Sequence, residues 1–153
     1  MKTIRAAIIG CGKIAQVHAQ TFINIEETEL VAVQSRNSAK AEATAAKFGA
    51  RPYTDIAEMI QRERIGVAVI CTPHPAHKQA AITAMQNGAH VLVEKPLAVT
   101  LEDCDSMIDM SNRTGLRLGM VSQRRFYPAC RRIKDTIDAG KIGTPMLGIV
   151  IMY

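Results

Sequence analysis

The sequence lacks tryptophan and has only three tyrosines and three phenylalanines in 153 residues. A core of alanine, valine, isoleucine, leucine and methionine is therefore expected, and one domain of this length can bury a substantial one. Long apolar runs are also missing, since the longest fall far below the roughly 20 residues that cross a bilayer. The opening residues, Met1–Arg5, show no signal-peptide layout. We expect a cytoplasmic protein with no membrane partner.

Close cysteine pairs are absent as well. The four cysteines, Cys11, Cys71, Cys104 and Cys130, are too widely spaced for the pairs that zinc sites and dithiol redox centres use. They are expected to be free thiols. The formal net charge of +5 suits an anionic ligand. Nucleic acid is not the expected partner, because the basic residues are scattered except at 124–134, where a solvated or interdomain face is expected.

Short apolar runs alternate with longer amphipathic segments along most of the chain. Strands are expected at Ile4–Ile9, Glu29–Ser35, Gly66–Cys71, His90–Val93 and Leu116–Val121, and helices at Lys13–Asn24, Ser38–Phe48, Asp55–Arg62, Pro75–Asn87 and Leu101–Arg113. Ser38 and Thr100 are the expected N-caps. Uninterrupted runs such as Val67–Ile70 indicate strands buried on both faces, hence a mostly parallel sheet. The alternation predicts an α/β fold with a doubly wound sheet.

The pattern changes after Gln123. A helix is expected at Pro128–Ala139, followed by Gly140–Gly143 and an apolar strand at Met146–Tyr153 with no partner strand after it. Natural domains normally cover such a hydrophobic edge strand. We therefore interpret residues 1–123 as one domain, and residues 124–153 as the crossover helix and first strand of a truncated second α+β domain.

A glycine-rich turn follows the first expected strand and opens the next helix. Gly10 permits a tight turn, Gly12 lets the backbone approach a pyrophosphate, and the small Ala15 allows close packing of helix on sheet. Unpaired amides at the helix start would receive the anion. The segment Gly10-Cys11-Gly12-Lys13-Ile14 is therefore predicted to bind a dinucleotide, with a tight turn that has no ligand as the alternative.

The residues at the end of the next strand are expected to contact the ribose of such a cofactor. NAD-specific enzymes usually place a carboxylate here for the 2′-hydroxyl, but the sequence reads Gln34-Ser35-Arg36-Asn37. Ser35 can hydrogen-bond a 2′-phosphate, and Arg36 can pair with it or stack on adenine. NADP(H) is therefore favoured over NAD(H). A solvated loop charge is the alternative role for Arg36.

The segment Cys71-Thr72-Pro73-His74, with His77, follows another expected strand, at the edge where ligands bind in open α/β sheets. These residues are predicted to line the nicotinamide ribose, with helix capping as the alternative. No third ligand converges on the two histidines, so a metal is not expected. His18 and His90 are expected in packing or surface roles.

Glu94-Lys95-Pro96 closes the strand at His90–Val93. Lys95 is the predicted catalytic residue, because an ammonium at a ligand-facing strand end can hydrogen-bond a substrate oxygen and polarise it. Glu94 and Pro96 are expected beside the cofactor. The alternative for Lys95 is an ordinary surface ion pair.

In this order, the motifs resemble those of the glucose–fructose oxidoreductase/inositol dehydrogenase (Gfo/Idh/MocA) family. The similarity rests on Gly10–Ala15, on Thr72-Pro73 with His77, and above all on Val91–Leu97, which contains Glu94-Lys95-Pro96. The segment from Gln123 to Pro128 resembles the crossover where family members leave the dinucleotide domain, and it adds Gln123 to the expected cofactor contacts. The resemblance also implies a cis peptide bond between Lys95 and Pro96.

The resemblance implies a Rossmann domain of an NAD(P)-dependent oxidoreductase that transfers hydride between nicotinamide and a sugar, polyol or related secondary alcohol or ketone. In the family, a second domain carries the substrate pocket and the usual homo-oligomer interface, with a downstream Asp and His for positioning and acid/base chemistry. Neither position exists in this sequence, so the chain alone is expected to bind cofactor without turnover. The alternative is a non-enzymatic dinucleotide sensor that signals through Met146–Tyr153.

Overall fold

The computed structural model describes residues 3–149. The chain divides into two compact units, Met1–Val121 and Ser122–Tyr153. Among the residues described, no helix is long and apolar enough to cross a membrane. The interpretation of the second unit as part of a truncated domain stays a prediction.

The first unit contains a six-stranded sheet with the order β3-β2-β1-β4-β5-β6, in which all neighbouring strands are parallel. The strands are β1 (Ile4–Ile9), β2 (Thr28–Gln34), β3 (Arg51–Tyr53), β4 (Val67–Ile70), β5 (His90–Val93) and β6 (Leu118–Met120). This confirms the predicted α/β fold with a doubly wound parallel sheet, the Rossmann arrangement. The strand order reverses between β1 and β4, so ligands are expected beyond the carboxyl ends of these two strands.

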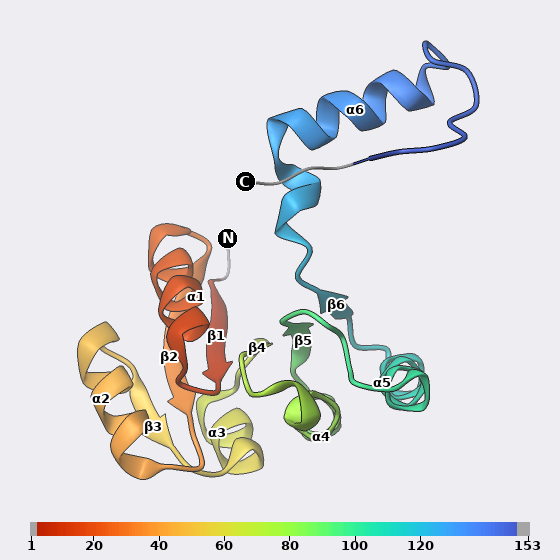
Figure 1. Cartoon of the computed structure of the whole chain (residues 1–153). Helices are drawn as coiled ribbons and strands as arrows, with labels where there is room; N and C mark the ends of the chain where they lie inside the picture. Colours follow the sequence, from red (N-terminus) through yellow and green to blue (C-terminus); the bar gives the residue numbers. More distant parts are fainter. Residues whose placement is uncertain (1–2, 150–153) are drawn as a thin grey trace. The chain divides into compact units, whose positions relative to one another are not determined.

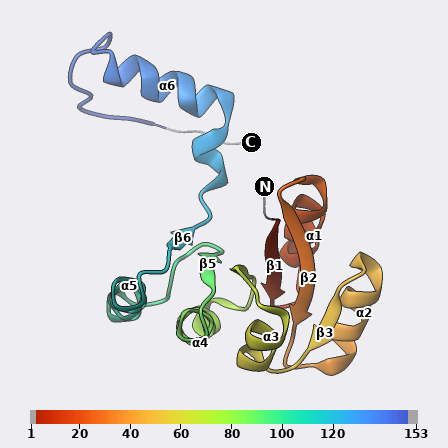
Figure 2. The ribbon, with the colours of Figure 1, turned by 180° about the vertical axis from the view of Figure 1, so that it is seen from behind.

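Helices cover both faces of the sheet (Figure 1, Figure 2). On one face, α1 (Lys13–Asn24) and α2 (Ser38–Phe48) contact each other and cover β1 and β2. On the other face, α3 (Ile56–Glu63), α4 (His77–Gln86) and α5 (Leu101–Thr114) form a row in which α4 contacts both neighbours. The sheet is therefore buried on both sides, as its uninterrupted apolar strands predict.

Successive residues of a strand contribute to different hydrophobic clusters. In β1, Ile8 joins the cluster that includes Ala19 of α1, whereas Ile9 joins the cluster that includes Ala84 of α4. Both alanines are fully buried. Small side chains at these positions let the helices lie close to the strands, so the core needs few aromatic residues.

The two edge strands, β3 and β6, differ in chemistry. The sequence did not predict β3, because Arg51-Pro52-Tyr53 contains no apolar run, yet these residues pair with β2. An edge strand tolerates a proline because one side of the strand needs no ladder hydrogen bond. At the other edge, β6 has the sequence Leu118-Gly119-Met120, and Met120 is 46% exposed.

Two predicted helix caps have different outcomes. Thr100 caps α5 as predicted, and its hydroxyl accepts the Asp103 N–H at 3.2 Å. The prediction for α2 was wrong by one residue: Asn37, not Ser38, is the N-cap, and its side-chain oxygen accepts the Lys40 N–H at 3.0 Å. Both serine and asparagine suit this position, so residue type alone does not distinguish them.

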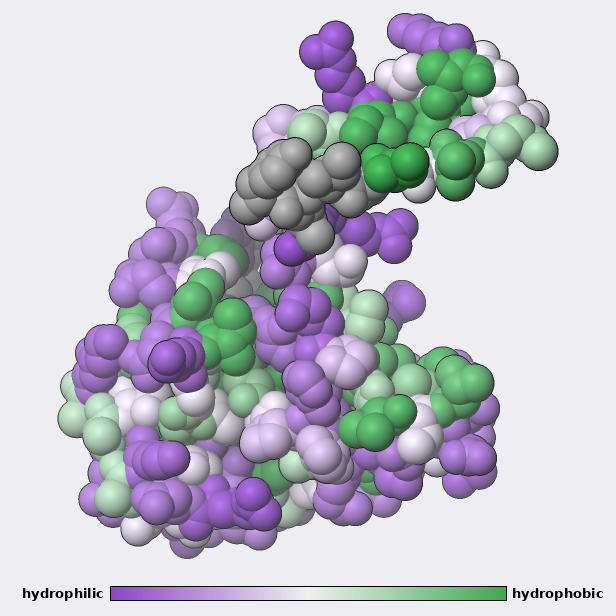
Figure 3. Space-filling model, viewed as in Figure 1, coloured by the Kyte–Doolittle hydropathy of each residue, from purple (hydrophilic) through white to green (hydrophobic). Residues whose placement is uncertain are grey.

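In the second unit, a 3₁₀ helix, η2 (Gln123–Phe126), precedes α6 (Pro128–Asp138), and neither contains a buried residue. Hydrophobic side chains are exposed on this unit (Figure 3), among them Phe126, Ile133 and Leu147. The described residues of this unit therefore form no hydrophobic core of their own.

The predicted strand at Met146–Tyr153 is not found in its described part. Residues 146–149 form no regular element, and the remaining four lie outside the described residues. A strand requires a neighbour that accepts and donates its backbone hydrogen bonds. The described residues of this unit contain no strand that could be this neighbour, so the prediction of a strand was wrong there.

Candidate functional site

A cleft of about 710 Å³ lies at the carboxyl ends of β1, β2 and β4. Many of the predicted cofactor-binding residues line it: Gly10, Cys11, Gly12, Lys13, Ile14, Ser35, Arg36, Cys71, Thr72 and Pro73. The sequence missed other lining residues: Gln34, Asn37, Lys40, Ile56, Ala76, Gln79 and Ala80. The cap sequence directly after β2 was an available signal for Asn37 and Lys40. Ile56 and Gln79 come from helices on the opposite face, and no local pattern indicates their approach.

Gly10 brings the ends of β1 and β4 into direct contact. Its φ is +98°, and a Cβ here would lie 2.7 Å from the carbonyl carbon of Cys71 and 2.8 Å from the nitrogen of Thr72. The Gly10 N–H donates to the Gln34 carbonyl at 2.7 Å, which also joins this turn to β2. Only glycine combines this φ with this close approach of two backbones.

Gly12 is the N-cap of α1 and has a different environment. Apart from Gly12 and its two chain neighbours, no heavy atom of the described residues lies within 4 Å of the position that a Cβ would take. No side chain caps the first amides of α1, and its first turn contains no acidic residue. These amides and the positive end of the helix dipole therefore favour an anion.

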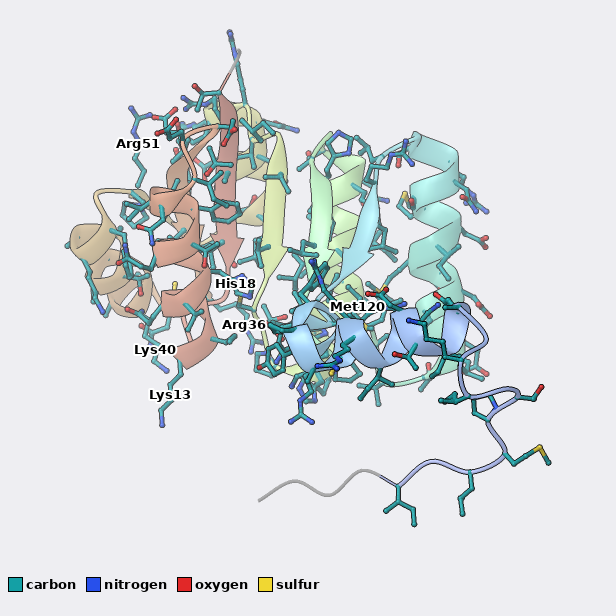
Figure 4. The ribbon with its side chains drawn as sticks, turned by 90° about the horizontal axis from the view of Figure 1, so that it is seen from above. Lys13, His18, Arg36, Lys40, Arg51 and Met120 are labelled. Carbon is teal, nitrogen blue, oxygen red and sulfur yellow. The ribbon has the colours of Figure 1, made fainter. Side chains whose placement is uncertain are left out.

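Three basic side chains line the same cleft. Lys13, Arg36 and Lys40 lie at one end of the sheet, whereas Arg51 lies at the other end (Figure 4). Within residues 3–149, none of the three cleft cations forms an ion pair. The cleft has no carboxylate in its lining. This electrostatic environment suits a ligand with several negative charges.

Thr72 contributes a buried polar atom to the cleft. Its Oγ1 has no hydrogen-bond partner in the part of the chain that the structure describes. Most buried hydroxyl groups in proteins are hydrogen-bonded, and leaving one unbonded costs about 1–3 kcal/mol. A ligand in the cleft that bonds this hydroxyl would remove that cost.

The two cysteines of the cleft are unreactive thiols. Burial, together with the nearby Glu94 carboxylate and Cys11, raises the pKa of Cys71 to about 12. Burial also raises the pKa of Cys11. Because the thiolate is the nucleophile, both cysteines shape the cleft and do not supply chemistry at neutral pH.

The predicted catalytic lysine lies in a turn that follows β5. The Lys95–Pro96 peptide bond is cis, which confirms the prediction. The Glu94 carboxylate contacts His18, with 2.8 Å between Oε1 and Nε2, and its Oε2 accepts the Lys95 N–H at 3.2 Å. Lys95 itself is exposed, and within the described residues its ammonium has no hydrogen-bond or ion-pair partner. The surface ion pair considered for Lys95 is therefore not formed there.

Two histidines are placed differently from the sequence-based expectation. His77 is fully buried, and its ring nitrogens lie 2.9 Å from the Pro96 carbonyl oxygen and 3.0 Å from that of Thr72. Its side chain therefore joins two backbone segments and has no polar atom left for a ligand. His18, expected in a packing or surface role, instead pairs with Glu94.

Some predicted site residues do not line the cleft: His74, His77, Glu94, Lys95 and Pro96. His74 is exposed, and its ring centroid lies 5.5 Å from that of His77. Gln123 belongs to the second unit. No group of three or more His, Cys, Asp or Glu side chains able to hold a metal occurs among the described residues.

Residues 4–122 match the Gfo/Idh/MocA family model, described as an oxidoreductase family with an NAD-binding Rossmann fold. The chain is a Gfo/Idh/MocA protein. The resemblance carried by Gly10–Ala15, Thr72-Pro73 and Glu94-Lys95-Pro96 is thereby confirmed. The family match covers the whole sheet and ends one residue beyond the first unit.

Individual Gfo/Idh/MocA relatives are dehydrogenases. The chain is 33% identical over 147 residues to 4-carboxy-2-hydroxymuconate-6-semialdehyde dehydrogenase of Sphingobium, covering 95% of this chain and 47% of that protein. It is 32% identical over 149 residues to inositol 2-dehydrogenase of Salmonella paratyphi B, covering 95% and 44%. Among solved structures, WlbA dehydrogenase from Bordetella pertussis with NADH and UDP-GlcNAcA has a TM-score of 0.89 at 31% identity, covering 93% and 44%. The chain thus spans less than half the length of these relatives.

The cleft residues of this Gfo/Idh/MocA chain fit a nicotinamide dinucleotide. The open space beside Gly12 leaves room for a pyrophosphate, and the free amides at the start of α1 can bind it. Thr72 offers a hydroxyl without a partner among the described residues. Arg36 and Lys40, near the end of β2, can bind further phosphate.

Proposed function

We propose that this chain is the cofactor-binding part of an oxidoreductase that transfers hydride between a nicotinamide dinucleotide and a sugar, polyol or related secondary alcohol or ketone. The observation that carries the proposal is the cleft at the glycine turn, in a Gfo/Idh/MocA chain whose exposed Lys95 follows β5 and has no partner among the described residues. The relatives support the substrate class, since they include an inositol dehydrogenase and a dehydrogenase bound to UDP-GlcNAcA.

Some residues of the chain bind the cofactor, and Lys95 polarises the substrate. When bound, the cofactor supplies or accepts the hydride. Gly12 and the first amides of α1 hold the pyrophosphate, and the Thr72 hydroxyl bonds the cofactor within the cleft. Lys95 donates a hydrogen bond to the reacting oxygen of the substrate and stabilises the negative charge that develops there. A separate acid/base group would move the proton.

We propose a preference for NADP(H) over NAD(H). No carboxylate lines the cleft at the end of β2 to bind a 2′-hydroxyl. Ser35, Arg36 and Lys40 line that part of the cleft instead and supply a hydroxyl and two cations. A 2′-phosphate adds negative charge at this position, where these groups can bind it.

The second unit fits the start of a substrate domain. Its described helix α6 has no buried residue, so its apolar side chains, such as Ile133, require further structure to cover them. In the whole protein we place the substrate pocket and a homo-oligomer interface in that domain. The chain alone would bind dinucleotide without turnover, and its free cysteines suit the cytoplasm.

A calorimetric titration of the chain with NADPH, and separately with NADH, tests the proposal. We expect both to bind, NADPH more tightly. Arg36→Ala should weaken NADPH binding roughly ten- to hundredfold, the value of a hydrogen bond to a charged group, and leave NADH nearly unchanged. Arg113→Ala is the control, because Arg113 is exposed in the last turn of α5, outside the cleft. Failure of both dinucleotides to bind would contradict the cofactor assignment.

A further inference from the structure

The residues on both sides of Lys95 contact imidazole rings from different helices. His18 of α1 contacts the Glu94 carboxylate at 2.8 Å, and His77 of α4 contacts the Pro96 carbonyl oxygen at 2.9 Å. These helices lie on opposite faces of the sheet. The three-residue turn is thereby fixed before and after Lys95, while the lysine side chain is left unpaired within the described residues.

Glu94 connects His18 to the backbone of Lys95. One carboxylate oxygen contacts the imidazole, and the other accepts the Lys95 N–H at 3.2 Å. The Glu94 N–H donates to the Ile70 carbonyl at 3.0 Å, so its backbone is also attached to β4. The side chains of His18 and Glu94 are only 16% and 12% exposed. Their hydrogen bond is therefore less weakened by water than one on the surface.

We propose that His18 is a positioning residue for Lys95. Through Glu94, it fixes the backbone from which the Lys95 ammonium extends, and it keeps the Glu94 carboxylate occupied. Without this contact, the carboxylate is free to turn toward the ammonium of Lys95, the next residue in the chain. The inference rests on the proposed role of Lys95 and adds a residue that the sequence had assigned to packing or the surface.

The position of His18 also connects its contact with Glu94 to the helix that begins at the proposed cofactor site. His18 lies in the second turn of α1, the helix whose first amides take part in the proposed pyrophosphate site. The pair His18–Glu94 thus joins the helix at the glycine turn to the turn that presents Lys95. A loss of the contact should act on the nicotinamide end of the cofactor more than on its ADP portion, because the glycine turn keeps its own contacts with Cys71 and Gln34.

The test uses the full 153-residue chain, labelled with ¹⁵N, and three substitutions of His18. His18→Ala removes the donor, His18→Leu removes it while filling the space, and His18→Gln supplies another N–H. The control is His90→Ala at the opposite end of β5, where the ring accepts the Arg117 N–H at 2.9 Å. The Lys95 backbone amide resonance and the affinities for NADH and ADP-ribose are measured for each protein.

We expect His18→Ala and His18→Leu to move the Lys95 amide resonance and to lower NADH affinity roughly twofold to tenfold more than ADP-ribose affinity, as for one hydrogen bond. His18→Gln should restore most of both effects, and His90→Ala should show neither. An unchanged Lys95 resonance in His18→Leu, or equal effects in His18→Leu and His90→Ala, would overturn the inference. If no protein binds NADH but the resonance moves and His18→Gln restores it, the proposed function fails and the positioning role holds.

Discussion

Replacing Gly10 and Gly12 by alanine, one at a time, separates the packing role of the glycine turn from its ligand role. At Gly10, the φ of +98° costs an alanine about 1–2 kcal/mol. Its Cβ would also lie within 3.0 Å of the Cys71 and Thr72 backbones, and relieving such an overlap costs about 1–3 kcal/mol. We therefore expect Gly10→Ala to lower the free energy of unfolding by roughly 2–5 kcal/mol.

Gly12→Ala should behave in the opposite way. Gly12 has φ −85° and ψ −172°, which alanine adopts freely, and within residues 3–149 no atom beyond the adjoining residues lies within 4 Å of the added Cβ. The free energy of unfolding should change by less than about 1 kcal/mol. The same Cβ occupies space that the proposed pyrophosphate needs, and an overlap of about 1–3 kcal/mol lowers dinucleotide affinity roughly five- to 150-fold.

Urea denaturation and calorimetric titration with NADPH measure the two effects on the same preparations. A Gly12→Ala protein that binds NADPH as tightly as the unmodified chain would refute the assignment of this turn to a pyrophosphate. Equal losses of stability in the two variants would refute the packing argument for Gly10. Either result would show that the spaces beside the two glycines do not have the roles inferred from their surroundings.

Three further predictions concern buried polar groups and thiols. Burial alone would raise the pKa of Glu63, but hydrogen bonds from Tyr53 at 2.6 Å and Arg51 at 2.8 Å lower it overall. The stability that the Glu63 carboxylate gives the fold should be complete above its unfolded pKa of about 4.3 and be lost as the pH falls. Glu63→Gln should therefore lower the free energy of unfolding by about 2 kcal/mol at pH 7 and by less in acid, as urea denaturation would measure. Thr72→Val should raise the melting temperature of the free chain, because it removes a buried hydroxyl that has no partner in the described part of the chain, yet weaken NADPH binding in calorimetry. Cys71, with a pKa of about 12, should resist iodoacetamide at pH 8 in the native chain and react after unfolding, as read by peptide mass spectrometry.

Local signals in the sequence were sufficient for several elements. The predicted bounds of β1, α1, α2 and β5 are those of the structure. A glycine turn separates β1 from α1, and Gly49, with φ +68°, follows α2 directly. Each boundary depends on the conformation of one or two residues, so the adjacent sequence is enough to predict it.

Features that depend on tertiary contacts could not be predicted from the adjacent sequence. β3 has only three residues and forms because β2 offers it a free edge, not because its own sequence favours a strand. The contact between His18 and Glu94 joins positions 76 residues apart. No periodic pattern encodes such a pair, although the motif containing Glu94 was recognised and His18 lies close to the glycine turn.

The unequal edges of the sheet bear on how this chain should be handled at high concentration. Arg51 and Pro52 make β3 a poor template for an incoming strand, because charge and a missing N–H both oppose pairing. β6 has neither feature, and its three residues include the half-exposed Met120. Intermolecular strand addition should therefore begin at β6, and a lysine in place of Met120 is the change that would best keep concentrated samples monodisperse.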